Sequence, residues 1–256
     1  MKEAQHRLQA AFERTHWWHR GKRRILRHLV EALVPPGVGR RVLEVGCGVG
    51  ENLGHLSGHY LCTGLDISEE ALGWARAHFP HIQFRQGDSP RCFENDLYQA
   101  DAILLLDVLE HIDDDRGFLS EVVRCARPGS YLFVTVPAAP SLWGIHDESL
   151  GHRRRYTEKM MRVLWTHQPV TPLLVTHYNA RLYPLAWVTR TVSKVLARPW
   201  GGAGTDVGPL PAWLGDALAW IFGGEAGDLL RALKTGKPAY HRGLSLFVIL
   251  RRETGS

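Results

Sequence analysis

The sequence predicts an α/β protein with a doubly wound, mostly parallel β-sheet, and three stretches of the chain carry this prediction. Residues 41–45 form a short β-branched and aliphatic run that leads directly into a glycine-rich turn at 46–50. Residues 60–66 form a second such run and end in an aspartate. Residues 101–107 are apolar on both faces, as a central parallel strand requires.

The composition is that of a globular protein with one core. The chain has 256 residues, of which 45% are hydrophobic and 22% are charged. Its net charge of +5 comes from local groups of lysine and arginine, so we predict no nucleic-acid partner. The four cysteines lie far apart, without a Cys-x-x-Cys pair or a signal peptide, and we expect reduced thiols and a cytoplasmic location. No apolar run approaches the roughly 18 residues of a membrane-spanning helix.

Two helices are predicted before the first strand, at residues 2–14 and 17–34. Trp17 and Trp18 lie at their junction, and a basic stretch follows at residues 22–24. Two adjacent tryptophans are not expected to face one core from a single helix face, so we expect at least one to face a cleft or a partner. Two interpretations stay open: a helix on the sheet edge with a solvated basic face, or a lid that touches the ligand.

The spacing of the glycine turn narrows the choice of ligand. A dinucleotide-binding fingerprint that starts at Gly46 needs glycine at position 51, where the chain has Glu51. The pattern Glu-x-Gly-x-Gly-x-Gly at 44–50 instead resembles the first motif of the class I S-adenosylmethionine-dependent methyltransferases. The resemblance implies that S-adenosyl-L-methionine lies against this turn, where glycine permits positive φ and a close approach. The implied contacts are Glu44, Gly46, Cys47, Gly48 and Gly50.

Further positions agree with this resemblance. Asp66 ends the second strand, where an acidic residue accepts hydrogen bonds from ribose hydroxyls; a helix-capping role is the alternative, and Ser68 partly takes it. Asp88 follows a third strand at 82–86, and in similar methyltransferases this carboxylate accepts a hydrogen bond from the adenine amino group. The resemblance also places three more residues at the cofactor: Ile67, Ser89 and Asp107.

The stretch Asp107-Val108-Leu109-Glu110-His111 is the second strong match. It resembles the fourth-strand motif of small-molecule methyltransferases such as those acting on ubiquinone precursors. The Asn-Pro-Pro-Tyr type of motif found in many methyltransferases of base amino groups is absent, which argues against a nucleic-acid substrate. A fifth strand at 131–137 follows a turn at 127–130 that is similar to the family's Leu-Lys-Pro-Gly-Gly turn.

The loop after the fifth strand, residues 143–156, is expected to lie over the reacting methyl group, because ligands of open parallel sheets lie beyond the carboxyl ends of the strands. Asp147 or Glu110 would orient a histidine base, and the arginines at 153–155 would hold an anionic group of the acceptor. The alternative is that the histidines make structural hydrogen bonds and the arginines form a solvated face. The candidate catalytic residues are His146, His152, Tyr156 and His111.

No metal site is predicted from the sequence. His111, His146, Asp147 and His152 would supply its ligands, but they contain no pair at metal-ligand spacing on a helix. The three acidic residues at 113–115 are interpreted as the start of a helix, where negative charge is favourable.

A sixth strand is predicted at 172–179 and a seventh at 244–251, and the resemblance implies that these two pair antiparallel and complete a seven-stranded sheet. The residues between them are too many for a hairpin and predict a helical insertion. Its apolar stripes are expected in the core, or alternatively on a basic amphipathic surface for a membrane-bound or lipid-linked acceptor or a dimer partner. They comprise Leu185, Val188, Val192, Val195 and Leu196; Leu214, Ala217, Leu218 and Ile221; and Ala226, Leu229, Leu230 and Leu233.

We therefore predict a single methyltransferase domain over residues 1–256. Its parts are a helical cap at 1–36, a cofactor-binding core at 37–180, an insertion at 181–239, and the last strand and tail at 240–256. The His-Trp-Trp opening and the His-Arg-Arg-Arg-Tyr-Thr stretch resemble a branch of bacterial methyltransferases that serves glycan, lipid-carrier or secondary-metabolite pathways.

The predicted reaction is direct in-line transfer of a methyl group to a hydroxyl of a small-molecule or glycan acceptor. The alternatives are a carbon or nitrogen acceptor in a secondary metabolite or lipid-linked intermediate, an NAD-dependent oxidoreductase that shares Asp66, and a noncatalytic protein that binds the cofactor.

Overall fold

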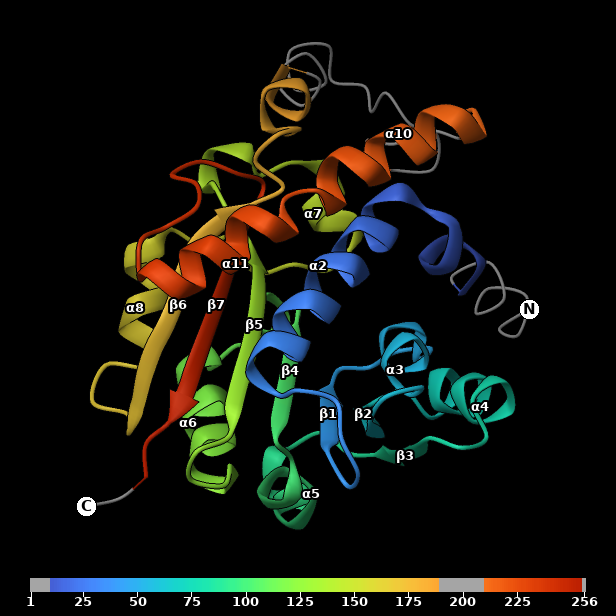
Figure 1. The fold of residues 1–256 in the computed structure, drawn as a ribbon, viewed down its shortest axis with the longest axis vertical. Helices are drawn as coiled ribbons and strands as arrows, with labels where there is room; N and C mark the ends of the chain where they lie inside the picture. The colour runs from blue at the N-terminus through green and yellow to red at the C-terminus, as the bar shows by residue number, and fades with distance from the viewer. Residues whose placement is uncertain (1–9, 189–209, 255–256) are drawn as a thin grey trace.

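The computed structural model describes residues 10–188 and 210–254, which fold around one seven-stranded sheet (Figure 1). The strand order is β3-β2-β1-β4-β5-β7-β6. The sheet reverses its order of growth between β1 and β4, and this switch point is where open α/β sheets bind ligands. The strands are β1 (Arg41–Val45), β2 (Leu61–Asp66), β3 (Gln83–Gln86), β4 (Ala102–Leu106), β5 (Tyr131–Pro137), β6 (Val170–Tyr178) and β7 (Ser245–Arg252).

The direction of the strands confirms the predicted fold class. Strands β1 to β5 pair parallel, whereas β7 lies antiparallel between β5 and β6. The two last strands occur where the sequence predicts them, within two residues at each end. A register shift between Pro172 and Leu174 accommodates the proline within β6.

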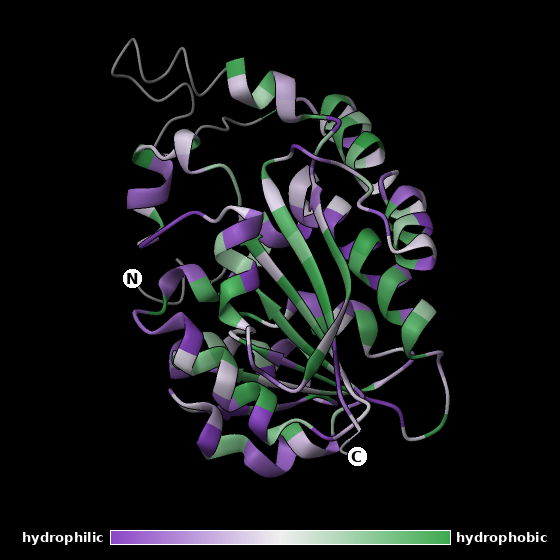
Figure 2. Cartoon of the chain, turned by 90° about the vertical axis from the view of Figure 1, so that its left-hand side faces the viewer, coloured by the Kyte–Doolittle hydropathy of each residue, from purple (hydrophilic) through white to green (hydrophobic). Residues whose placement is uncertain are grey.

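Helices cover both faces of the sheet, and the apolar strands lie between them (Figures 1 and 2). Successive residues of β4 face opposite layers: Leu104 joins the core cluster under α2, and Leu105 joins the cluster under α6. The helices are α2 (Trp17–Leu33), α3 (Glu51–Leu56), α4 (Glu69–His78), α5 (Glu94–Gln99), α6 (Asp115–Cys125), α7 (Ile145–Ser149), α8 (Glu158–Leu164), α10 (Ala212–Gly223) and α11 (Ala226–Thr235), with short 3-10 turns η1 (Pro90–Phe93), η2 (Leu109–His111) and η3 (Pro140–Leu142).

The described part of the helical insertion packs on the N-terminal helix. Helices α10 and α11 both contact α2, and Phe222 and Leu229 lie in the same buried cluster as Ile25. A Cβ atom at Gly21 would lie 2.4 Å from Cδ1 of Phe222, so glycine at this position permits the close approach of α10. Helices α2, α10 and α11 thus form one layer over the sheet.

The residues of the predicted apolar stripes differ in how deeply they are buried. Ala226 and Leu229 are buried, and Leu214, Leu218 and Ile221 are partly buried. Leu185 and Val188 are exposed, so the prediction that they lie in the core is wrong. Val192, Val195 and Leu196 lie outside the described residues. Among the described helices, none is long and apolar enough to cross a membrane.

Candidate active site

The glycine turn joins β1 to α3 at the switch point of the sheet. Gly46, Gly48 and Gly50 all have positive φ, at 73°, 53° and 80°. A Cβ atom on Gly46 would lie 2.6 Å from Cγ2 of Val108, so the turn packs directly on the residues after β4. At Gly48, a Cβ atom would meet nothing within 4 Å. The turn therefore leaves open space along the main chain at its centre, where a ligand can lie.

Glu44 lies beneath this turn and is 1% exposed. Its Oε1 atom accepts a hydrogen bond of 2.7 Å from Nδ2 of Asn52 in α3, whereas Oε2 has no hydrogen-bond partner among the described residues. Burial raises the pKa of Glu44 to about 8, because the carboxylate loses its hydration and the Asn52 bond offsets only part of that loss. A cationic group of a ligand beside Glu44 would stabilise its charged carboxylate form.

This raised pKa predicts a pH-dependent stability for the cofactor-free protein. Between the ordinary glutamate value of 4.5 and about 8, the folded protein keeps a proton on Glu44 that the unfolded chain releases. Stability contributed by Glu44 is therefore full below pH 4.5 and is lost as the pH rises through 8. We expect the thermal midpoint to fall over this range in the wild type and to fall less in Glu44→Gln, measured by calorimetry. Parallel pH curves for the two proteins would contradict a buried, uncompensated Glu44.

Asp66 connects the glycine turn to the following helix. Its Oδ2 atom accepts a hydrogen bond of 2.8 Å from the amide of Gly48, and its Oδ1 atom accepts one of 2.9 Å from the amide of Ser68. Ser68 itself caps α4 by accepting a hydrogen bond from the amide of Ala71, as predicted. Asp66 is therefore not the cap of α4, and its carboxylate is fixed beside the open space at Gly48. The next residue, Ile67, is exposed.

The other predicted cofactor residues have different surroundings. The Cys47 side chain is buried against Gly64, and its amide and carbonyl bond to Leu65 and Gly50, so Cys47 shapes the turn from inside the protein. Asp88 is exposed after β3. Ser89 begins η1, where its hydroxyl accepts a hydrogen bond from the amide of Arg91.

Asp107 has an unexpected partner from the N-terminal helix. It ends β4 with a φ of 60°, and its Oδ1 atom accepts a hydrogen bond of 3.1 Å from Thr135. Its Oδ2 atom forms an ion pair with Nζ of Lys22, which is only 5% exposed and lies 4.9 Å from the ring centroid of Trp18. The sequence places a basic stretch here but gives no signal for which acid it meets.

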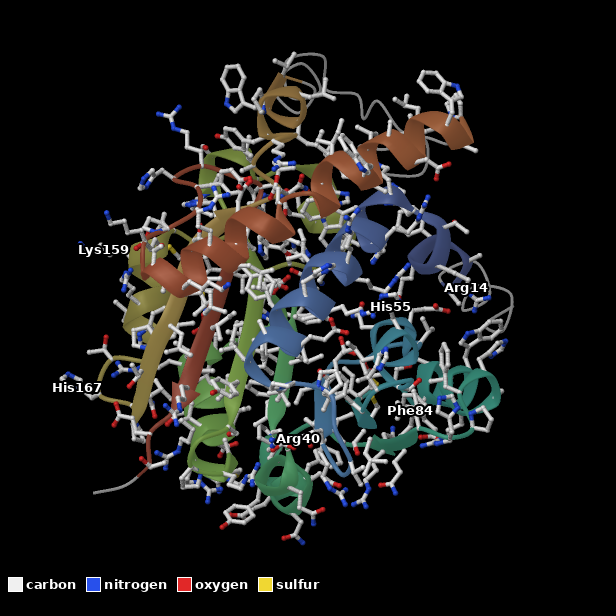
Figure 3. All side chains as sticks on the ribbon, in the orientation of Figure 1. Arg14, Arg40, His55, Phe84, Lys159 and His167 are labelled. Atoms are coloured by element: carbon white, nitrogen blue, oxygen red, sulfur yellow. The ribbon has the colours of Figure 1, made fainter. Side chains whose placement is uncertain are left out.

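The N-terminal helix presents a solvated basic face only in part, since Arg20 and Arg24 are exposed but the two basic residues between them are not. Lys22 is buried, and Arg23 is also buried and donates hydrogen bonds to the carbonyls of Glu13 and Arg14. Trp17 and Trp18 both pack partly on one core cluster, so the expectation that they could not is wrong. Arg14 reaches Glu51 at the start of α3, 2.8 Å away (Figure 3).

The acceptor side of the site is a cluster of three residues from two segments. Glu110 and His111 belong to η2, directly after Asp107, and His152 lies after α7. One side-chain oxygen or nitrogen of each lies within 4.8 Å of the others. The rings of His111 and His152 are 5.0 Å apart and nearly perpendicular. The structure therefore brings together two of the predicted histidines and Glu110.

Asp147 holds this cluster in place. It is completely buried, and its Oδ1 atom lies 3.0 Å from Nδ1 of His152 and 2.8 Å from Nε of Arg155. Its Oδ2 atom accepts a hydrogen bond from the amide of Gly144 at the start of α7. The prediction named Asp147 as one of two candidates to orient a histidine, and its bond to His152 agrees with that choice.

The arginine run is structural. Arg153 pairs with Asp113, Arg154 with Asp115, and Arg155 is buried against Asp147 and the carbonyl of Ala138. Each of these arginines already has a protein carboxylate, which favours a structural role over holding an anionic group of the acceptor.

Tyr156 must also be reassigned. Its side chain is 1% exposed, its hydroxyl donates to Oδ2 of Asp115 at 2.6 Å, and burial together with this carboxylate raises its pKa. A buried phenol bonded to a carboxylate does not take a proton from a substrate, so Tyr156 is a structural residue.

His146 lies in α7 beside Asp147, half-buried and outside the cluster of three. Tyr178 and Asn179, at the end of β6, are also buried.

Comparison with known proteins identifies relatives of this chain. A family model described as a methyltransferase domain matches residues 17–181. The ubiquinone biosynthesis O-methyltransferase of Aeromonas salmonicida (strain A449) is 30% identical over 104 residues, 38% of this chain and 43% of that protein. A probable S-adenosylmethionine-dependent methyltransferase of Mycolicibacterium smegmatis is 33% identical over 100 residues, 39% of this chain and 38% of that protein. The matches thus span less than half of each relative.

Solved structures share the fold at low sequence identity. A chain from the complex between the Haloferax volcanii Trm112 methyltransferase activator and the putative methyltransferase superposes with a TM-score of 0.57, at 18% identity, over 96% of this chain and 93% of that one. An S-adenosylmethionine-dependent methyltransferase from Mesorhizobium loti superposes with a TM-score of 0.54, at 16% identity, over 88% and 96% of the two chains. These likenesses show the fold.

Proposed function

The chain belongs to the methyltransferase domain family that it matches over residues 17–181, and we propose that it transfers a methyl group from S-adenosylmethionine to a hydroxyl of a small-molecule or glycan acceptor. The observation that carries this proposal is the Asp147–His152 pair, which lies beside Glu110 and His111 after the end of β4. Family membership argues against the NAD-dependent oxidoreductase and the noncatalytic protein that the sequence left open.

The residues around the glycine turn fit S-adenosylmethionine. The open main chain at Gly48 gives room for the ligand, and the fixed carboxylate of Asp66 beside it suits two ribose hydroxyls. The unpartnered Oε2 atom of Glu44 suits a cationic group. Asp88 is accessible for the adenine amino group, and the carboxylate of Asp107 is already neutralised by Lys22.

The acceptor side is suited to a group that must lose a proton. The sulfonium of the cofactor supplies a methyl group with a good leaving group, so the protein chiefly aligns the reactants. A hydroxyl becomes a strong nucleophile only as its proton leaves. His152 serves this step because Asp147 holds its Nδ1 atom and leaves Nε2 free to take the proton. The relatives named as O-methyltransferases support a hydroxyl acceptor over a nitrogen or carbon acceptor.

This function can be tested by turnover with labelled S-adenosylmethionine against a metabolite extract and a set of polyols, phenols and glycans. We expect the label in a methyl ether, identified by mass spectrometry of the product. Label on nitrogen or carbon would reject the hydroxyl assignment, and tight binding of NADH without binding of S-adenosylmethionine would reject the methyltransferase.

An exposed aromatic surface supports the further proposal that the acceptor is carried on a lipid. Trp213 and Trp220 lie on one face of α10, seven residues apart, and each is 71% exposed. Trp187 on the helical turn after β6 is also exposed. Indole rings favour the interface between lipid and water, and arginines and a lysine occur in the sequence between these segments.

Removing the two indoles tests this surface. We expect Trp213→Ser/Trp220→Ser to reduce binding to vesicles of phosphatidylglycerol at least tenfold in co-sedimentation, because the buried aromatic area is lost. Tyr98→Ser is the matched control, since Tyr98 is an exposed aromatic residue on α5. Equal vesicle binding by all three proteins contradicts a membrane surface, and dissociation of a dimer by the double variant in light scattering assigns the surface to self-association instead.

A further inference from the structure

The side chain of Glu110 is an unusual feature of the acceptor cluster. It is 0% exposed, and neither carboxylate oxygen has a hydrogen-bond partner among the described residues. A buried acid without a partner is costly, and proteins keep such groups where a ligand or ion completes them.

The two histidines beside Glu110 are held in one tautomer. Nδ1 of His152 faces the Asp147 carboxylate at 3.0 Å, and Nδ1 of His111 faces the carbonyl of Gly151 at 3.3 Å. Because both partners can only accept hydrogen bonds, each Nδ1 carries the proton and each Nε2 keeps its lone pair. Carboxylates and carbonyls support metal-binding histidines in this way.

Three side chains that can supply metal ligands therefore converge at one place. A carboxylate oxygen of Glu110 and one ring nitrogen of each histidine lie within 4.8 Å of one another, and Glu110 is anchored in the core while His111 is exposed. Two imidazoles and one carboxylate match Zn²⁺ and related first-row ions, whereas Mg²⁺ and Ca²⁺ prefer oxygen donors alone. Three protein ligands would leave at least one position open.

We propose that Glu110, His111 and His152 bind a divalent transition-metal ion, and that the acceptor hydroxyl is activated as a further ligand of that ion. Metal binding depends on these three side chains alone, whereas the catalytic role of the ion rests on the proposed function. The bound ion lowers the pKa of the hydroxyl, and its proton leaves to water. The oxygen then bonds to the methyl carbon as the carbon–sulfur bond breaks, and sulfur keeps the electron pair. In the loaded site, Nε2 of His152 is a ligand and not a base.

This proposal departs from the prediction of no metal site, and the reason is visible in the structure. The sequence separates His111 from His152 by helix α6, strand β5, the 3-10 turn η3 and helix α7, so spacing along the chain gives no signal for their proximity. The sequence also gives no reason to include Glu110 in a metal site, because only the fold shows that this side chain is buried.

Cobalt is a suitable probe, because Co²⁺ replaces zinc and its visible absorption reports nitrogen and oxygen ligands. The full chain, stripped with a chelator, is titrated with Co²⁺ and followed by absorption and calorimetry. We expect one ion per chain, with affinity at least tenfold weaker in Glu110→Gln and in His111→Asn. Glu110→Gln keeps the shape of the neutral acid, so the fold should persist, and unchanged binding of S-adenosylmethionine checks this directly.

His167→Asn is the matched control. His167 is exposed near the start of β6, at the far side of the molecule, and asparagine tolerates its φ of 66° (Figure 3). Wild-type protein that binds no more Co²⁺ than a protein lacking both His111 and His152 overturns the site. Cobalt binding unaffected by Glu110→Gln and His111→Asn overturns it as well.

The role of the ion is tested separately from the proposed function. Methyl transfer to a hydroxyl that stops in chelator and returns with Zn²⁺ or Co²⁺ supports activation on the metal. Equal transfer in chelator rejects that role but leaves the hydroxyl methyltransferase intact, with His152 as its base. Absence of transfer under every metal condition, with Co²⁺ still bound at the three residues, rejects the proposed function and leaves the metal site standing.

Discussion

Replacement of His152 by asparagine is expected to lower kcat for methyl transfer by a factor of about 10² to 10⁴, with the affinity for S-adenosylmethionine unchanged. The side chain is 10% exposed and oriented by Asp147, so Nε2 has a defined position at the acceptor. Asparagine keeps a polar group toward Asp147 and removes Nε2. The measurements are initial rates with the identified acceptor and calorimetric binding of the cofactor.

Two comparisons make this result specific. His146→Asn should lower kcat less than His152→Asn, because His146 lies outside the cluster of three, and His167→Asn should leave the rate unchanged. Asp147→Asn should reduce both kcat and stability, because Arg155 is left with a buried charge, at a cost of about 3 to 5 kcal/mol. A His152 variant with the wild-type rate, or with lost cofactor affinity, would contradict the assignment.

Replacement of Asp66 by alanine is expected to weaken binding of S-adenosylmethionine by a factor of about 10² to 10⁴. Two hydrogen bonds from ribose hydroxyls to a charged carboxylate contribute roughly 1.5 to 3 kcal/mol each. The variant also frees the amides of Gly48 and Ser68, so the turn loses its anchor. Calorimetry with S-adenosylmethionine and S-adenosylhomocysteine measures the change.

Asp88→Ala provides the matched comparison for Asp66. Asp88 is exposed and is proposed to accept a single hydrogen bond, so its loss should weaken binding about tenfold. The assignment of the ribose site fails if Asp88→Ala has the larger effect, or if Asp66→Ala binds the cofactor like the wild type.

The cofactor side of the site could be predicted from the sequence because its residues follow strand ends. A strand that runs into glycines at 46, 48 and 50, and a second strand that ends at Asp66, place both features at one edge of a parallel sheet. In these stretches, the short sequence pattern is enough to predict the geometry of the backbone. The positive φ of all three glycines agrees with the role expected of them.

The acceptor side could not be predicted to the same depth, because its residues meet only through tertiary packing. The sequence offers His146 and His152 as equal candidates, and the start of α7 decides between them by turning Asp147 toward His152. Tyr156 was predicted as a catalytic residue, yet its side chain is buried in the core. The partner of Lys22 lies 85 residues away along the chain, beyond the reach of any local pattern.

The Lys22–Asp107 ion pair has a consequence for how this protein can be divided or combined with others. Helix α2 carries the cation that balances the acids after β4, and the same helix forms the floor under α10 and α11. A chimaera that joined residues 37–180 to another cap would leave Asp107 facing Glu110 without that cation. The cap thus supplies a charge that balances the acids after β4, so a chimaera that exchanges the insertion should carry helix α2 with it.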